Sequence, residues 1–383
     1  MLRGTLQAAI LHVVILALAL SGGCWQQPSS ASPANPDADL ARLFQQFGLV
    51  DGSRPQVLEA ELNDRFASAT PVALADGQAA IAGQISDGDD VDVYTLGPLR
   101  RGDRLVVTSM IDGPLDATAA VFDDQQCLIF ANDDRIWRVD PRPYINVIIR
   151  HDSDPAYLAI ASSTGSGHGQ YGLLVQIYPG NDVPAPQPQI VLLDFDGADQ
   201  VSIGGTGPLD LPAFDAGLIS YELAGQTSQI VDGIEDVLRQ DYADYDVQFY
   251  STADGDLPDG QYTTLYFGGY NPALLGLADN VDYYNADPTQ QAIVFIETFA
   301  LFMPYRPTTT EIAQVIGNVA SHELGHLLGL NHVADPTELM DSTATATQML
   351  QDQDFHRAEL KDEVFPIGYQ DSARLLAESV GLR

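Results

Sequence analysis

The sequence has 383 residues, of which 45% are hydrophobic and 18% are charged. That length and composition exclude a disordered chain and predict ordinary buried cores, in two domains besides the N-terminal region. The formal net charge is -36, with 17 Lys and Arg against 53 Asp and Glu, which disfavours a nucleic-acid partner because phosphate binding needs clustered positive charge. Such acidity suits an exported protein, or one that supplies carboxylates to calcium.

The N-terminus predicts an export signal over residues 1–24. Arg3 gives a short positive region, and the apolar run over residues 8–20 is too short to span a bilayer. The run ends in "LALSGGC", which resembles a bacterial lipoprotein signal. The resemblance implies that Cys24 becomes the lipidated N-terminus and holds the protein on a membrane, in the periplasm or at the cell surface. Ser21 stands where the lipoprotein pattern has leucine, so an ordinary secretory signal and a secreted protein remain the alternative.

Residues 25–56 predict a flexible tether, and residues 57–178 predict an all-β domain. The tether begins with "WQQPSSASPANPDADL", which is rich in Pro, Ser and Ala. Short alternating runs follow, separated by Gly, Asp and Pro, among them "DRLVVTSMI", "TAAVFDD", "CLIFAND" and "YGLLVQIY". Alternation at this spacing is typical of a β-sandwich.

The order of these runs resembles the bacterial pre-peptidase C-terminal domain, a jelly-roll-like sandwich often attached to secreted peptidases. The segments that carry the resemblance are "ELNDRFASAT", "GQISDGDDVDVYTL", "GDRLVVT", "VFDDQQCLIFANDD" and "YLAIASSTGSGHGQYGLLV". Such a domain usually follows the peptidase, whereas here it comes first. An accessory binder, a spacer and a removable prosegment all remain open as its role.

The cysteine content argues against a disulfide-dependent fold. Only Cys24 and Cys127 are present, so Cys127 has no partner once Cys24 is lipidated or removed. We expect Cys127 to be a buried strand cysteine. The functional alternative is a thiolate that blocks a zinc ion in a latent form.

Oxygen-rich turns in the same region are candidate Ca²⁺ ligands. Solvated turn residues that cap strands explain the same pattern equally well, because Asp and Asn favour turns for their own hydrogen bonds. The residues concerned are Asp87, Asp89, Asp90, Asp92, Asn132, Asp133 and Asp134.

A proline-rich linker over residues 179–189 leads to a second domain, residues 190–383. "IVLLDFDGA", "YTTLYFGGY" and "QAIVFIETF" predict buried strands. A later helix is expected to begin at Thr308, which can form a capping box with Glu311. An earlier predicted helix carries on one face Ile230, Ile234, Val237 and Leu238. Helix and strand therefore alternate, as in an α/β or α+β domain.

The stretch "HELGHLLGLNH" predicts a metal site. His322 and His326 lie four residues apart on one face of a helix and can reach one ion, with Glu323 beside them. Gly329 can end the helix in the left-handed conformation and let the chain turn back, so that His332 reaches the same ion. Three neutral imidazoles leave a tetrahedral Zn²⁺ one open position, as a catalytic site requires.

The extended pattern HExxHxxGxxH resembles that of the metzincin zinc endopeptidases, in which a methionine turn follows the third ligand. "NHVADPTELMDST" supplies Met340 for that turn and looks most like the matrixin branch. Ser342 stands where astacin-like members carry tyrosine, so no tyrosine ligand is expected there. The resemblance implies Zn²⁺, protein or peptide substrates, and Glu323 as a general base rather than a ligand. Residues 268–285, "GGYNPALLGLADNVDYYN", are expected to form one edge of the cleft.

The sequence thus predicts a multidomain protein in which an all-β sandwich precedes an α+β metzincin-like domain. The favoured function is an exported zinc-dependent endopeptidase. One alternative is a surface binding or adhesion protein with an idle zinc domain, although the intact Glu323 argues against it. Another is a peptidase that cleaves only its own chain, for example in the linker.

Overall fold

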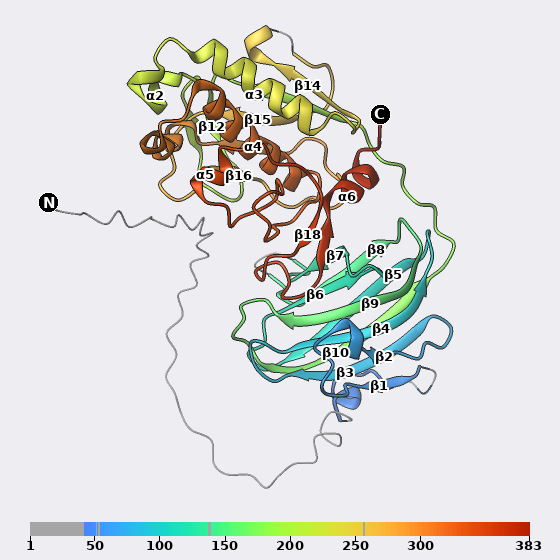
Figure 1. Ribbon diagram of the computed structural model, residues 1–383. Helices are drawn as coiled ribbons and strands as arrows, with labels where there is room; N and C mark the ends of the chain where they lie inside the picture. Colours follow the sequence, from blue (N-terminus) through green and yellow to red (C-terminus); the bar gives the residue numbers. More distant parts are fainter. Residues whose placement is uncertain (1–41, 51, 53, 137–138, 256) are drawn as a thin grey trace, which may run out of the picture. The chain divides into compact units, whose positions relative to one another are not determined.

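The computed structural model describes residues 42–50, 52, 54–136, 139–255 and 257–383 (Figure 1). The signal peptide predicted for residues 1–24, and Cys24 with it, lie outside these residues. Among the helices of the described ranges, none has both the length and the apolar character needed to cross a bilayer.

The described chain forms two compact units. The first, called the sandwich unit, runs to Pro184 and also includes Glu359–Gln370. The second, called the α+β unit, consists of Ala185–Ala358 and Asp371–Arg383. The boundary between Pro184 and Ala185 falls within the stretch predicted as a linker, where the structure has no helix or strand until Gln189.

Two five-stranded sheets make up the sandwich unit, and the predicted all-β fold is confirmed. One sheet has the order β1 (Gln56–Leu58), β3 (Gln78–Ile85), β10 (Gly169–Tyr178), β5 (Arg104–Asp112), β8 (Tyr144–Ile148). The other has the order β2 (Thr70–Pro71), β4 (Val91–Leu99), β9 (Ser153–Ser162), β6 (Ala117–Phe122), β7 (Leu128–Asn132). Most neighbouring strands are antiparallel. The two short N-terminal strands are the exceptions, since β1 pairs in parallel with β3 and β2 pairs in parallel with β4.

Part of the predicted tether is instead core. The tether was expected to cover residues 25–56, but Leu43, Phe44 and Leu49 are each less than 5% exposed. They pack against small residues of β3, Ala80 and Ala82. Apolar side chains gain free energy by leaving water, so this stretch joins the sandwich rather than staying extended.

Residues Glu359–Gln370 complete the sandwich unit from the far end of the chain. This segment runs from the last residue of β18 (Arg357–Glu359) into β19 (Tyr369–Asp371), and these two strands pair with each other. Leu360 and Phe365 are buried among sandwich residues, and the ring of Phe365 packs edge-on against Phe122 with centroids 5.5 Å apart. The second domain was predicted as one range over residues 190–383. This segment belongs instead to the sandwich unit, because its apolar side chains are part of the sandwich core.

A mixed sheet forms the centre of the α+β unit, and the predicted α+β class is confirmed. Its order is β14 (Val247–Ser251), β11 (Gln189–Asp194), β15 (Thr263–Phe267), β17 (Gln291–Val294), β16 (Gly276–Ala278). The first four strands are parallel, and β16 is antiparallel at the edge. A separate hairpin consists of β12 (Ala198–Val201) and β13 (Leu209–Leu211). The helices are α2 (Ala216–Ile219), α3 (Thr227–Asp241), α4 (Thr309–Leu327), α5 (Ala346–Met349) and α6 (Ser372–Ser379).

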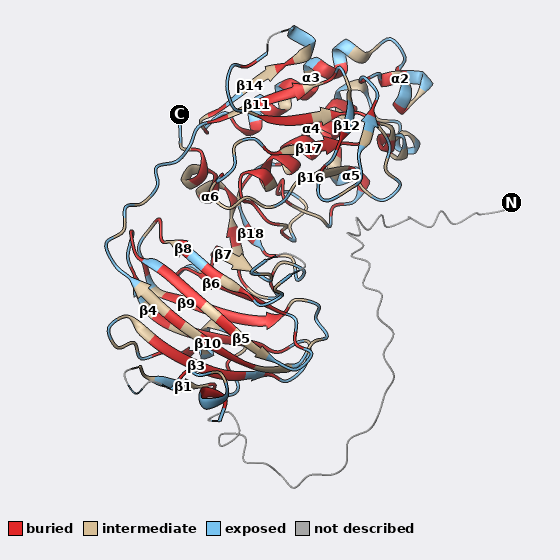
Figure 2. Ribbon diagram, turned by 180° about the vertical axis from the view of Figure 1, so that it is seen from behind, coloured by how far each residue is buried: buried red, intermediate tan, exposed pale blue. Residues whose placement is uncertain are grey.

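Most residues of helix α4 are buried, and the helix is largely red in Figure 2. Two glycines let α3 and α4 approach closely. A Cβ on Gly233 would lie 2.7 Å from the Cβ of Ala313, and one on Gly317 would lie 2.6 Å from the Cβ of Val237. Since carbon atoms do not pack at such distances, the missing side chains set the separation of the two helices. Helix α4 also contacts β16 and β17.

The burial of Phe365 predicts that a change near the C-terminus destabilises the N-terminal sandwich. Phe365→Ala should lower its free energy of unfolding by about 3–5 kcal/mol, since the ring leaves a cavity in a packed core. The measurement is hydrogen exchange of the amides of β6 and β9 in increasing urea. Asp362→Ala, at an exposed position of the same segment, is the control and should change stability by less than about 0.5 kcal/mol. Unchanged protection of β6 in the Phe365 variant would contradict this role.

Candidate metal centre

The ends of α4 are determined by local sequence. At the N-terminus, the Glu311 amide donates to Thr308 Oγ1 (3.2 Å) and the Thr308 amide donates to Glu311 Oε2 (2.7 Å), which is the predicted capping box. At the C-terminus Gly329 has φ +96°. The Gly329 amide donates to the His326 carbonyl and the Leu330 amide to the Gly325 carbonyl, a Schellman ending that reverses the chain direction.

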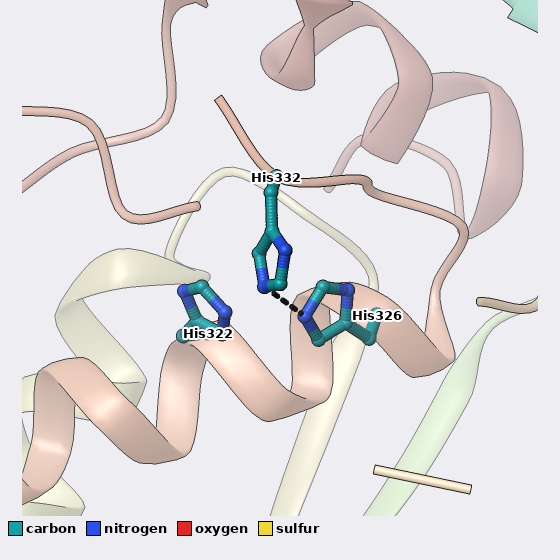
Figure 3. Close-up of side chains that lie close together, drawn as sticks. All are labelled: His322, His326 and His332. Carbon is teal, nitrogen blue, oxygen red and sulfur yellow. Dashed lines mark hydrogen bonds between the residues drawn. The ribbon is translucent and has the colours of Figure 1, made fainter. Parts of the chain in front are cut away.

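That reversal brings the three predicted histidines together. His322 and His326 lie on α4, and His332 on the returning segment points toward them (Figure 3). Their ligand atoms all lie within 4.8 Å of one another, and the Nε2 atoms of His326 and His332 are 3.2 Å apart. Two nitrogens bound at about 2.0–2.1 Å to one tetrahedral Zn²⁺ would be separated by roughly 3.3 Å, so the spacing fits that ion.

Backbone carbonyls orient two of the rings. Nδ1 of His322 lies 2.8 Å from the Leu339 carbonyl, and Nδ1 of His326 lies 2.8 Å from the Leu330 carbonyl. A carbonyl can only accept, so each Nδ1 carries the proton and each Nε2 keeps its lone pair for a metal. Burial lowers the pKa of His322 to about 3 and that of His326 well below its usual value. Both imidazoles are therefore neutral, as metal ligands must be.

Met340 lies beneath the same helix. It is fully buried, and a Cβ on Gly325 would come within 2.5 Å of its sulfur, so the glycine between the two helical histidines makes room for the methionine. The Val333 amide donates to the Met340 carbonyl (3.0 Å), which ties the residue after His332 to this turn. The predicted methionine turn thus packs directly under the histidine cluster.

Glu323 lies on α4 beside the cluster and is 7% exposed. Burial raises the pKa of its carboxyl group to about 8, although a hydrogen bond from the Ala278 amide acts in the opposite direction. Ala278 belongs to β16, inside the 268–285 segment that was expected to form one edge of the cleft. Such a carboxyl group changes protonation state near neutral pH, which a proton carrier requires.

Several supporting residues were missed by the sequence analysis. The carbonyls of Leu330 and Leu339 could not have been found, because every residue has a carbonyl and only the turn geometry aims it. Glu338, two positions before Met340, was missed because the turn also carries Asp335 and Asp341, and the sequence alone does not single it out. It is fully buried, accepts a hydrogen bond from the Met340 amide, and has its pKa raised to about 7 by burial.

The predicted calcium ligands do not assemble as a set. Most of them serve as turn residues, which was the alternative interpretation: Asp87 accepts from the Asp89 amide (3.0 Å) and Asp133 from the Asp134 amide (2.8 Å). Asn132 bonds the backbone of Asp134 and Tyr144. Short side-chain-to-backbone bonds of this kind satisfy the loop without an ion.

Asp90 and Asp92 belong to a different carboxylate cluster. Carboxylate oxygens of Glu61, Asp64 and Asp90 lie within 4.8 Å of one another. Asp92 is fully buried, accepts from the Tyr171 hydroxyl (2.6 Å), and has its pKa raised to about 9 by burial and then by the charge of Glu59. Burial raises the pKa of Glu59 to about 8. Glu59, Glu61 and Asp64 were not identified from the sequence as members of this cluster, since they lie about 30 positions before Asp90 and Asp92.

Cys127 is fully buried in the sandwich unit. Its amide donates to Asp123 Oδ1 (2.8 Å), and its backbone pairs with Tyr369. This is the position of a core strand cysteine, the simpler of its two interpretations.

One family model matches the part of the chain that holds this site. The family model described as Matrixin, of peptidase family M10, matches residues 234–359, a range that contains α4, the three histidines and Met340. The match confirms the metzincin resemblance and supports a zinc metallopeptidase at the level of the family. No curated protein matches the chain in sequence.

The comparison with solved structures found matches that each cover part of this chain. The periplasmic g-type lysozyme inhibitor PliG of Aeromonas hydrophila is 20% identical over 32% of this chain and 99% of that chain (TM-score 0.23). The pre-peptidase C-terminal domain of a Bacillus anthracis collagenase is 20% identical over 28% and 94% (TM-score 0.22). Archaemetzincin from Methanopyrus kandleri is 16% identical over 44% and 87% (TM-score 0.25).

Proposed function

We propose that this protein is an exported zinc-dependent endopeptidase, with Glu323 as its general base and proteins or peptides as substrates. The observation that carries the proposal is a buried glutamate of raised pKa next to three imidazoles that converge on one point. His322, His326 and His332 would hold the metal. Bound there, Zn²⁺ would supply a positive charge that polarises the scissile carbonyl and acidifies the attacking water.

The chain's own residues would then move the protons. Glu323 accepts a proton from the attacking water and passes it to the leaving nitrogen. The Ala278 amide, which donates to Glu323, holds the carboxylate in place before it accepts the proton. The carbonyls of Leu339 and Leu330 keep two rings in the ligating orientation throughout.

Separate substitutions should distinguish the metal ligands from the base. Glu323→Gln keeps the shape of the side chain but cannot accept the proton, so about one zinc per chain should remain while casein and peptide-library cleavage falls by at least about 100-fold. His326→Ala should lose both zinc and cleavage. Metal content is measured by atomic emission on purified residues 25–383. His168→Ala, an exposed histidine of the sandwich unit, is the control, and full activity in Glu323→Gln would refute the assignment.

The same experiment separates the alternative functions. A protein with an idle zinc domain would bind zinc and cleave nothing added to it, in wild-type and variant alike. A peptidase that acts only on its own chain would show a cut in the 179–189 linker of the wild type and none in Glu323→Gln.

Export and lipidation at Cys24 are part of the proposal, and an intact-mass measurement of the mature N-terminus from cells tests them.

We also propose that the cluster of Glu61, Asp64 and Asp90 binds a divalent cation, with calcium favoured because all the candidate ligands are oxygens. The proposal is supported by the charge of the surroundings, because Glu59 and Asp92 are carboxyl groups beside the cluster. Burial and then Glu61 raise the pKa of Glu59, whereas burial and then the charge of Glu59 raise that of Asp92. In addition, Asp92 Oδ1 is buried without a hydrogen-bond partner. Like charges gathered in a low-dielectric interior are unfavourable unless protonated or neutralised by a cation.

Calcium binding predicts a thermal shift that depends on Asp90. With zinc held at one equivalent, CaCl₂ at about 100 times its dissociation constant should stabilise the sandwich unit by about 2.7 kcal/mol, seen as a higher midpoint in calorimetry. Asp90→Asn should abolish the shift, whereas Asp87→Asn, which changes only an exposed turn residue, should retain it. An equal shift in both variants, or none in the wild type, would contradict the site.

A further inference from the structure

Gly276 occupies a position of β16 where a side chain would collide with Glu323. A Cβ built on Gly276 would lie 2.3 Å from Glu323 Oε1, 2.6 Å from its Cγ and 2.7 Å from its Cδ. Real side chains do not approach so closely. The carboxylate of Glu323 therefore fills the space that any residue other than glycine would need for its own side chain.

The backbone conformation does not explain this glycine. The residues with positive φ do not include Gly276, and it lies in a strand paired with β17, where it faces Val294. Glycine is unfavourable in the interior of a strand, and it often marks a place where another group approaches the backbone closely. Here the approaching group is a carboxylate.

The strand provides a second contact to the same carboxylate. Two residues further along β16, the Ala278 amide donates to Glu323, and pairing of Ala278 with Ala292 of β17 fixes that amide in place. The strand β16 thus offers Glu323 a hydrogen-bond donor at one position and free space at another. Removal of either should move the carboxylate.

We propose that Gly276 is a positioning residue for the reaction proposed above: its missing side chain lets the Glu323 carboxylate rest against β16, beside the histidine cluster. The catalytic part of this inference depends on the proposed peptidase function, whereas the contact itself does not. Gly276 touches neither the histidines nor the substrate in this role. It acts only through Glu323.

The test compares Gly276→Ala with Gly207→Ala, since a Cβ on Gly207 meets no atom within 4 Å. In Gly276→Ala, zinc content should stay near one per chain, kcat should fall at least about tenfold, and KM should change less than about threefold. The pH dependence of kcat should also shift, because the displaced carboxylate loses its amide donor. Gly207→Ala should match the wild type in all four measurements. Wild-type kcat in Gly276→Ala would overturn the proposal.

A double-mutant cycle tests the contact without reference to activity. Gly276→Ala should lower the thermal midpoint of the wild type by several degrees, but should have no such effect in a Glu323→Ala background, where the space is empty. An equal loss in both backgrounds, or a loss of zinc, would overturn the inference by showing that the glycine serves other packing. If the wild type cleaves nothing, the proposed function fails while the cycle still decides whether Gly276 accommodates Glu323.

Discussion

The burial of α4 is the constraint on which the rest of the site depends. Its apolar residues form the core with α3 and the sheet, and the glycine contacts at Gly233 and Gly317 leave no slack between the two helices. The spacing of His322 and His326 is set by the helix itself, and the packing of α4 fixes the direction in which both side chains point. The third histidine, His332, can then be supplied by the short segment after α4. Only the direction that this segment takes after Gly329 has to be determined.

Backbone groups supply much of the precision that the side chains need. Two carbonyls orient two imidazoles, and the Ala278 amide holds the proposed base. One of these carbonyls belongs to Leu339, between the buried Glu338 and Met340. The methionine turn therefore does more than fill volume: it carries the acceptor that sets the tautomer of His322. A turn of different shape would keep the three ligands and still lose the orientation of one ring.

Local patterns in the sequence predicted what depends on local rules. The alternating runs gave the sandwich strands, the Thr308 and Glu311 pair gave the start of α4, and the histidine spacing with Gly329 gave the cluster. Most of the contacts that escaped prediction join residues far apart in the chain. Gly276 is 47 positions before Glu323, and Glu61 is 29 before Asp90; neither pair has a periodicity that links its members. The role of Leu43 and Phe44 was missed because the Pro-rich stretch before them resembles a tether.

The segment Glu359–Gln370 bears on the role of the sandwich unit. A removable prosegment must leave as an intact piece when the linker is cut, but here the sandwich core includes Leu360 and Phe365, which stay covalently attached to the α+β unit. A cut within 179–189 would thus leave the sandwich holding a segment of the other piece, and separation would expose apolar side chains on both. Simple release of the sandwich after self-cleavage is therefore unfavourable. Because a C-terminal segment contributes to the sandwich core, the arrangement agrees better with a sandwich that stays attached to the α+β unit as an accessory or binding module.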